Sequence, residues 1–131
     1  MTEETPSHYA EGLALDVLDL METMDKGLRK AFCFGNAMKY VARAGLKDGE
    51  TTLQDLKKAR QYLCEAGYSP SFIWTFTGTE NFRKTKGIIL KKLMIGWNTG
   101  SCEVLCQAAG AIAGWIAYEE KKVERRANDT A

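Results

Sequence analysis

The sequence predicts an all-α fold, a compact single-domain bundle of about five helices, and two observations support it. Apolar residues recur at helical spacing along most of the chain. Glycines and polar turns interrupt those runs at the lengths typical of helix connections. Because 131 residues with 45% hydrophobic content suffice for one core, we expect a single helical domain over residues 8–122. A flexible N-terminus at 1–7 and a frayed tail at 123–131 would flank it.

The first two helices are predicted from apolar stripes and from the glycines at their ends. An amphipathic helix is expected over residues 13–25, with Gly27 ending it. Its stripe consists of apolar residues spaced three or four apart: Leu13, Val17, Leu20, Met21 and Met24. A second helix is expected from Leu28 to Ala44, interrupted or restarted at Gly35-Asn36, with Gly45 as a left-handed cap.

The third helix is predicted from its capping residues. Thr51 and Thr52 each suit an N-cap, and the helix is expected to run to about Ala66, before Gly67. The short turn before it makes the second and third helices antiparallel neighbours. Pro70 and a β-rich cluster then predict a loop with one short extended element near residues 72–77.

Two further helices are predicted in the second half of the chain. A basic amphipathic helix is expected over residues 81–97, with Ile89, Leu93 and Trp97 facing inward. Its lysines Lys84, Lys91 and Lys92 would face outward. Ser101 is then expected to cap a long last helix.

The last helix also carries the prediction about assembly. Gly110 and Gly114 are separated by three residues, a spacing that permits the close approach of another helix. The helix around Trp115 is nearly all apolar. We therefore expect a homo-oligomer built partly on this helix.

Composition argues against several classes of function. The net charge of +1 gives no strong field toward nucleic acid or an anionic membrane. The apolar run at 104–118 is shorter than the roughly 20 residues that a bilayer requires. Four cysteines without framework spacing indicate reduced thiols in a cytoplasm, and Cys102 with Cys106 is interpreted as core packing in preference to a metal pair. Seven acids lie in residues 1–26 and thirteen Lys and Arg in 27–100, so an acidic first helix should face a basic remainder.

Polar residues at helical spacing form the candidate site. On the second helix they share one face: Asn36, Lys39, Tyr40 and Arg43. The third helix repeats the pattern with Asp55, Lys58 and Tyr62. Because the two helices are expected to be antiparallel neighbours, both stripes are predicted to converge on one cleft.

The chemistry of this cleft suits a nucleotide. Converging Lys and Arg bind multivalent anions, and Tyr stacks on a base or donates to phosphate. Gly35-Asn36, at an expected helix start, would let backbone N–H groups approach phosphate oxygens closely. The alternative interpretation is a solvated face in which Asp55 pairs with a lysine or caps its helix.

Several separate motifs of the sequence resemble those of a known family. They are His8-Tyr9, Gly12, Asp16 with Asp19, GNAMKYVAR at 35–43, Lys47 and DLKKARQYL at 55–63. The chain is similar, over residues 8–63, to a small phage-encoded family of unknown function that includes the early-gene nucleotide kinase of short-tailed coliphages. The extent of the resemblance divides the predicted domain into a family-like core at 8–66 and a divergent half at 67–122.

The resemblance implies phosphoryl transfer that makes deoxynucleoside diphosphates from monophosphates, without a P-loop, in the cytoplasm of a bacterial host. The nearest approach to a P-loop, GTENFRKT at 78–85, has Arg83 in place of the second glycine. The residues expected to act in transfer are Lys39, Arg43, Lys58 and His8. Those expected to bind substrate are Tyr9, Gly35, Asn36, Tyr40, Lys47, Asp55, Tyr62, Asp16 and Asp19. No metal site is assigned, although Mg²⁺ held by Asp16 and Asp19 stays open as a cofactor.

Two alternatives to a nucleotide kinase with deoxynucleotide partners remain open. One is a non-catalytic phage protein that binds a host or anti-phage defence protein, or sequesters a nucleotide. The other is an all-α nucleoside triphosphate pyrophosphohydrolase, for which Asp16 and Asp19 would be a thin carboxylate cluster. Nucleic-acid binding by the basic stretch FRKTKGIILKKLMIGW at 82–97 is the weaker option, because amphipathic helices with lysine faces are common.

Overall fold

The computed structural model describes residues 17–25, 27–46 and 49–130, and it confirms the all-α prediction. It contains five helices: α1 Val17–Met24, α2 Leu28–Arg43, α3 Gly49–Glu65, α4 Phe82–Thr99 and α5 Cys102–Thr130. No strand occurs within these described ranges. None of the helices found there is long and apolar enough to cross a membrane.

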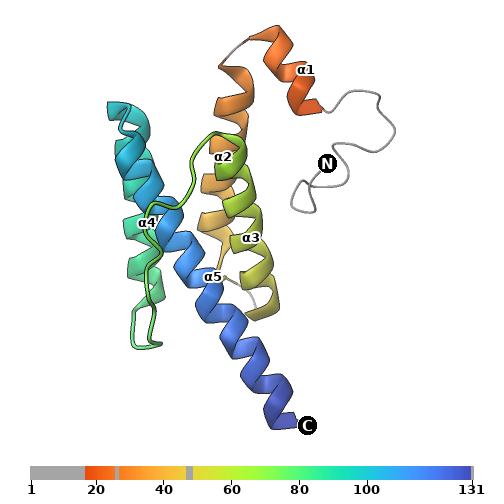
Figure 1. Ribbon diagram of the computed structural model, residues 1–131, viewed down its shortest axis with the longest axis vertical. Helices are drawn as coiled ribbons and strands as arrows, with labels where there is room; N and C mark the ends of the chain where they lie inside the picture. Colours follow the sequence, from red (N-terminus) through yellow and green to blue (C-terminus); the bar gives the residue numbers. More distant parts are fainter. Residues whose placement is uncertain (1–16, 26, 47–48, 131) are drawn as a thin grey trace.

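The helices form two antiparallel hairpins that pack against each other (Figure 1). One hairpin is α2 with α3, and the other is α4 with α5. The hairpins meet where α3 packs on α5 and α2 packs on α4. The short helix α1 lies against α2 at one end of the bundle, whereas the C-terminal part of α5 extends beyond the other helices at the opposite end.

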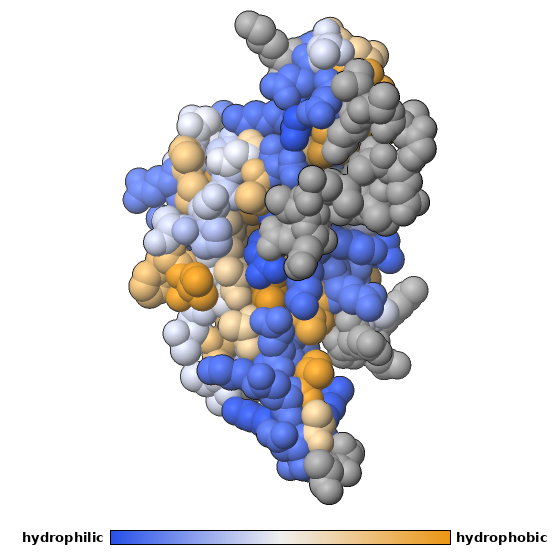
Figure 2. Space-filling view, turned by 45° about the vertical axis from the view of Figure 1, so that its right-hand side comes forward, coloured by the Kyte–Doolittle hydropathy of each residue, from blue (hydrophilic) through white to orange (hydrophobic). Residues whose placement is uncertain are grey.

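The core lies between the hairpins and is built from the apolar stripe of each helix. Its largest fully buried side chains come from every helix and include Leu18, Val41, Leu56, Leu63, Ile89, Leu93, Ile112 and Trp115. Burial of each such side chain contributes about 1.5–3 kcal/mol relative to its exposure. The projecting end of α5 is largely hydrophilic, as the lower part of Figure 2 shows. The buried contacts between the two hairpins therefore hold α2 and α3 in a fixed position.

Helix α2 is continuous, so the predicted interruption at Gly35-Asn36 is wrong. The helix runs unbroken from Leu28 to Arg43, and Gly35 is an exposed interior position. A glycine weakens a helix by about 1 kcal/mol without forcing a break, and buried neighbours such as Cys33 and Phe34 hold the turn in place. Gly45 follows the helix with φ +82°, which confirms the predicted left-handed position.

The first helix differs from its prediction in the residues that it buries. Leu18 is fully buried and Met21 partly so, whereas Leu20 and Met24 of the predicted stripe are exposed. The pattern predicted a helix correctly, and Val17 and Met21 of its stripe are partly buried, but the inner face also contains Leu18 in place of Leu20. Residues two apart lie about 200° apart around a helix, so Leu18 and Leu20 cannot share one face. Residues 13–16 of the predicted helix and the N-terminal segment at 1–7 lie outside the described residues.

Helix α3 begins earlier than the sequence predicts. It starts at Gly49, so Thr51 and Thr52 lie within its first turn and not before it. The helix ends at Glu65, followed by Gly67 with φ +102°, as predicted. The earlier start places Thr51 on the exposed surface and buries Thr52.

The two glycines of α5 are covered by the chain itself. An irregular segment between α3 and α4 crosses them, and the Trp74 N–H donates to the Gly110 carbonyl at 3.2 Å. A Cβ at Gly110 would collide with the Phe72 carbonyl oxygen, and one at Gly114 with the Trp74 carbonyl oxygen. The expected close approach is therefore made by a loop instead of another helix. The reason for expecting an oligomer through these glycines no longer holds.

Helices α4 and α5 otherwise follow the prediction closely. The Asn81 side chain caps α4 through the N–H groups of Arg83 and Lys84, and Ser101 caps α5 through the N–H of Val104. The predicted inward position of Trp97 is wrong, because the residue is 40% exposed, although its ring centroid lies 4.5 Å from that of Phe34. The expected frayed tail is helical in the structure, because α5 continues to Thr130.

Candidate functional site

The predicted polar stripes of α2 and α3 meet around one ring, that of Tyr40. Lys39 and Arg43 come from α2, and their charged groups lie 4.6 Å and 5.4 Å from the Tyr40 ring centroid. Lys58 reaches the same ring from α3, with Nζ at 5.2 Å. At these distances the ring face attracts each cation, at about 0.5–1 kcal/mol where exposed. Three positive charges from two helices are thus gathered at one point.

Tyr62 holds the Tyr40 ring in place. Its ring stacks on that of Tyr40, with centroids 5.8 Å apart and planes inclined by 6°. Tyr62 is only 3% exposed, and Phe32 packs edge-on against it. Tyr62 therefore fixes the position of the Tyr40 ring, which is itself partly exposed.

A hollow of about 430 Å³ opens beside these cations. It is lined by Arg43, Leu46, Thr51, Gln54, Asp55 and Lys58. Asp55 is only 8% exposed, yet its carboxylate forms no hydrogen bond or ion pair with any residue that the structure describes. Because the carboxylate lines the hollow and is not closed off from solvent, it is available to a ligand that donates a hydrogen bond.

The charge in the hollow is not balanced by nearby acids. Within the described ranges, no ion pair joins Lys39, Arg43 or Lys58 to a carboxylate. The hollow also lies at the N-terminal end of α3, where the helix dipole favours an anion. The site is therefore suited to a ligand with more than one negative charge.

A larger hollow lies elsewhere and has different chemistry. It measures about 580 Å³ and is lined by side chains of α3 and of the C-terminal half of α5. Its lysines are matched by acids, and Lys57 Nζ lies 3.5 Å from Glu120 Oε2. We place the candidate site in the smaller hollow, because there the cations have no such partners.

Two predicted substrate-binding residues, Gly35 and Asn36, lie on α2 away from the lining of the hollow. Because both are inside a continuous helix, their backbone N–H groups are used for helical hydrogen bonds and are not open to phosphate. The Asn36 side chain donates to the Phe32 carbonyl at 2.9 Å. The expected anion site at a helix start is therefore absent from this position.

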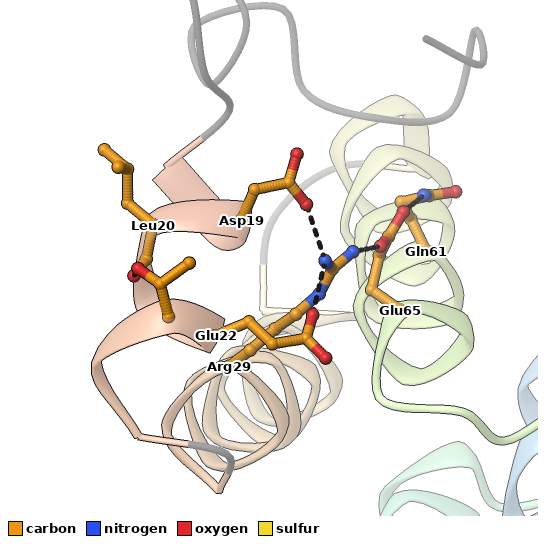
Figure 3. A network of polar contacts seen from close by, with 7 residues as sticks. Asp19, Leu20, Glu22, Arg29, Gln61 and Glu65 are labelled. Carbon is orange, nitrogen blue, oxygen red and sulfur yellow. Dashed lines mark hydrogen bonds and ion pairs between the residues drawn. The ribbon is translucent and has the colours of Figure 1, made fainter.

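Asp19 also lies apart from the cation cluster, at the other end of the bundle. It accepts from Arg29 Nη1 at 2.9 Å, in a network that joins α1 to α3 (Figure 3). Arg29 also binds Glu22 at 3.2 Å and Glu65 at 2.8 Å, and Gln61 donates to Glu65. The hydrogen bond that Arg29 donates to Glu65 raises the pKa of Arg29. Asp19 is therefore paired with Arg29 and takes no part in the cluster around Tyr40.

Four predicted site residues cannot be placed. His8, Tyr9, Asp16 and Lys47 lie outside the described residues. Among the described residues, no group of three or more His, Cys, Asp or Glu side chains could hold a metal ion. The Cys102 and Cys106 thiols do lie together on α5, with sulfur atoms 3.7 Å apart.

Sequence reasoning missed three lining residues: Leu46, Thr51 and Gln54. The signal for two of them was present, because Thr51, Gln54, Asp55 and Lys58 follow the spacing i, i+3, i+4 and i+7. Extending the stripe of α3 back by one turn would have found them. Leu46 belongs to the turn after α2, where no periodicity applies.

The comparisons with known proteins support part of the resemblance. Residues 3–64 match the model of a family described as a protein of unknown function (DUF3310). The matched segment contains α1, α2 and nearly all of α3, and so carries all of the cation cluster around Tyr40. No curated protein and no solved structure matches the chain. The segment is thus similar to a small family whose function is unknown.

Proposed function

We propose that the hollow between α2 and α3 binds a phosphorylated nucleotide, a deoxynucleotide by the family resemblance. The observation that carries this is the gathering of Lys39, Arg43 and Lys58 around Tyr40, with no acidic partner among the described residues. The three cations neutralise phosphate charge, and the exposed part of Tyr40 offers a surface for a base. The volume of about 430 Å³ is within the range of small-molecule sites.

Asp55 adds a preference for the ligand. Because its carboxylate lines the hollow and has no partner in the described chain, a ligand that donates a hydrogen bond to it should be favoured. A nucleotide satisfies this condition with a sugar hydroxyl or a base N–H. Inorganic phosphate at neutral pH has far less donor capacity, so we expect nucleotides to bind more tightly than phosphate alone.

The reaction that we propose for this site is phosphoryl transfer between nucleotides. Such transfer depends mostly on positioning and on neutralising charge. Convergent Lys and Arg side chains supply both without a P-loop. The resemblance to the phage family would place this activity in the cytoplasm of an infected bacterium.

One assay separates this proposal from its rivals. The protein is incubated with a labelled deoxynucleoside triphosphate and each monophosphate, with and without Mg²⁺. Labelled diphosphates indicate a kinase, and released pyrophosphate indicates a pyrophosphohydrolase. Thermal stabilisation without turnover indicates a binding protein. If no nucleotide is turned over or raises the unfolding temperature, the proposal fails.

Adjacent lysines of α3 provide a matched pair of variants. Lys58→Ala removes a cation of the site, and we expect it to weaken nucleotide binding about tenfold or more. Lys57→Ala removes a lysine that pairs with Glu120 instead, and it should bind like the wild type. Isothermal titration gives both affinities, and circular dichroism checks that helix content is unchanged. Equal losses in the two variants would indicate a general charge effect in place of a site.

A second candidate function is binding to a host or defence protein. The observation in its favour is the exposed apolar surface of α4, where Ile88, Met94 and Ile95 are 48%, 47% and 39% exposed. This surface lies in the half of the chain outside the family match. Ile88→Asp combined with Ile95→Asp should leave nucleotide binding intact if the two functions use separate surfaces.

A further inference from the structure

A second, smaller hollow lies beside the proposed nucleotide site. Its volume is about 100 Å³, and it is lined by Ala44, Gly45, Leu46, Phe82, Arg83, Lys86 and Trp115. Leu46 lines both hollows, so the two are neighbours at the end of α2. The volume equals roughly three water molecules, which suits a single tetrahedral anion and excludes a nucleoside.

The ring of Trp115 lines this hollow. The residue is 2% exposed, and its ring stacks on Phe82, with centroids 5.1 Å apart. Its indole Nε1 is buried without a hydrogen-bond partner in the described part of the chain. Because the ring is held in place beside the hollow, its indole N–H can report a charge that binds there.

Two cations of α4 line the same hollow. Arg83 is exposed and Lys86 is half-buried, and neither has an ion pair with a residue in the described ranges. Lys86 Nζ donates to the Ala42 carbonyl at 3.0 Å, which holds it against the last turn of α2. Burial and the charge of Arg83 lower the pKa of Lys86. The second effect reflects the closeness of two positive charges, which a bound anion would offset.

We propose that this hollow binds a second phosphoryl group, held by Arg83 and Lys86 beside the ring of Trp115. The inference rests on the proposed nucleotide function and deepens it. A transfer reaction brings together two phosphorylated partners, and the two hollows on either side of Leu46 provide a place for each. The phosphoryl group belongs either to a second nucleotide or to the far end of a triphosphate.

The indole N–H of Trp115 offers a direct readout in the intact chain. The protein contains three tryptophans, and Trp115→Phe identifies the Trp115 signal among the indole resonances in a ¹⁵N-labelled sample. Titration with inorganic phosphate should move this resonance, because the anion would bring negative charge beside the indole ring. A resonance that stays fixed at saturating phosphate, and in the presence of nucleotide, overturns the inference.

Variants of α4 test the cations. Arg83→Gln with Lys86→Gln should weaken the phosphate response of Trp115 at least about tenfold. Lys84→Gln changes an exposed lysine of the same helix that does not line the hollow, and it should respond like the wild type. An unchanged response in the double variant contradicts the assignment.

The same titration separates this inference from the proposed function. In Lys58→Ala, nucleotide binding should fall while the response of Trp115 to phosphate persists. If nucleotides bind the wild type without moving the Trp115 resonance, the second hollow is rejected and the first proposal stands. Comparing a monophosphate with a triphosphate identifies the source, because only a triphosphate should reach both hollows as a single molecule.

Discussion

The side chain of Tyr40 determines how charge is arranged on the α2–α3 hairpin. Its ring is fixed by stacking on buried Tyr62 and attracts three cations that would otherwise repel one another. Each cation–ring contact contributes only about 0.5–1 kcal/mol, so the cluster is easily reorganised by a stronger anionic partner. The cations around Tyr40 therefore add little to the stability of the fold and are available to bind an anion.

A glycine on α5 provides a residue-scale prediction about stability. Gly110→Ala should lower the free energy of unfolding by about 1–3 kcal/mol, because the added Cβ would collide with the Phe72 carbonyl oxygen. Gly35→Ala is the matched control, since an added Cβ there has no heavy atom within 4 Å. It should stabilise α2 by about 0.5–1 kcal/mol. Urea unfolding measures both, and a neutral Gly110→Ala would show that the loop is not held against α5.

At the scale of elements, the turn before α4 depends on one carboxylate. Glu80 accepts the backbone N–H groups of Thr77 and Gly78 at 2.9 Å and 2.8 Å. The bond from Thr77 is the largest contribution to lowering the pKa of Glu80 below 4.5. Asn81 caps α4 in the next position. The turn and the cap together set the start of the helix that carries Arg83 and Lys86.

The lowered pKa predicts how acid affects this turn. A carboxylate with a depressed pKa in the folded state contributes stability above its unfolded value, and this is lost as pH falls through the folded value. The unfolding temperature of the wild type should therefore fall more steeply between about pH 5 and about pH 3 than that of Glu80→Gln. Glu124→Gln, which removes an exposed carboxylate of α5, is the charge-matched control. Parallel curves for the wild type and Glu80→Gln would contradict this role of Glu80.

The elements also show how far the sequence alone could lead. Helical spacing predicted that Lys39, Tyr40 and Arg43 share a face, because side-chain direction is fixed by 3.6 residues per turn. The burial of Tyr62 and the pairing of Asp19 with Arg29 were not predictable in this way. Both depend on how separate helices pack.

The loop that covers Gly110 also could not be predicted from helical periodicity. Its spacing from Gly114 correctly indicated a close approach, but periodicity carries no information on which segment approaches. The loop that does so has no repeat of its own, and its contacts to α5 are set by backbone hydrogen bonds such as that from Trp74 to Gly110. The contacts of an irregular segment therefore cannot be predicted from periodicity. Here such a segment covers the glycines of α5 and makes them inaccessible to another helix.

At the scale of the whole molecule, the family-like segment depends on the half that follows it. The apolar face of α3, including Leu56 and Leu63, is fully buried, and α5 packs against this helix. Helix α4 packs in turn on α2. The match to the family model ends within α3, yet the core of the bundle continues through both halves.

This packing predicts that the chain unfolds as one unit. A fragment of residues 1–67 would expose the core faces of α2 and α3 to water, at about 25 cal/mol per Å² of apolar surface, so it should lack a cooperative transition. In the full chain, the near-ultraviolet signal of the α5 residue Trp115 and the far-ultraviolet helix signal should share one midpoint. The variant Trp74→Phe with Trp97→Phe leaves Trp115 as the only indole for this measurement. Separate midpoints, or a fragment with cooperative melting, would show that the two halves fold independently, and the two neighbouring hollows would then lose their fixed geometry.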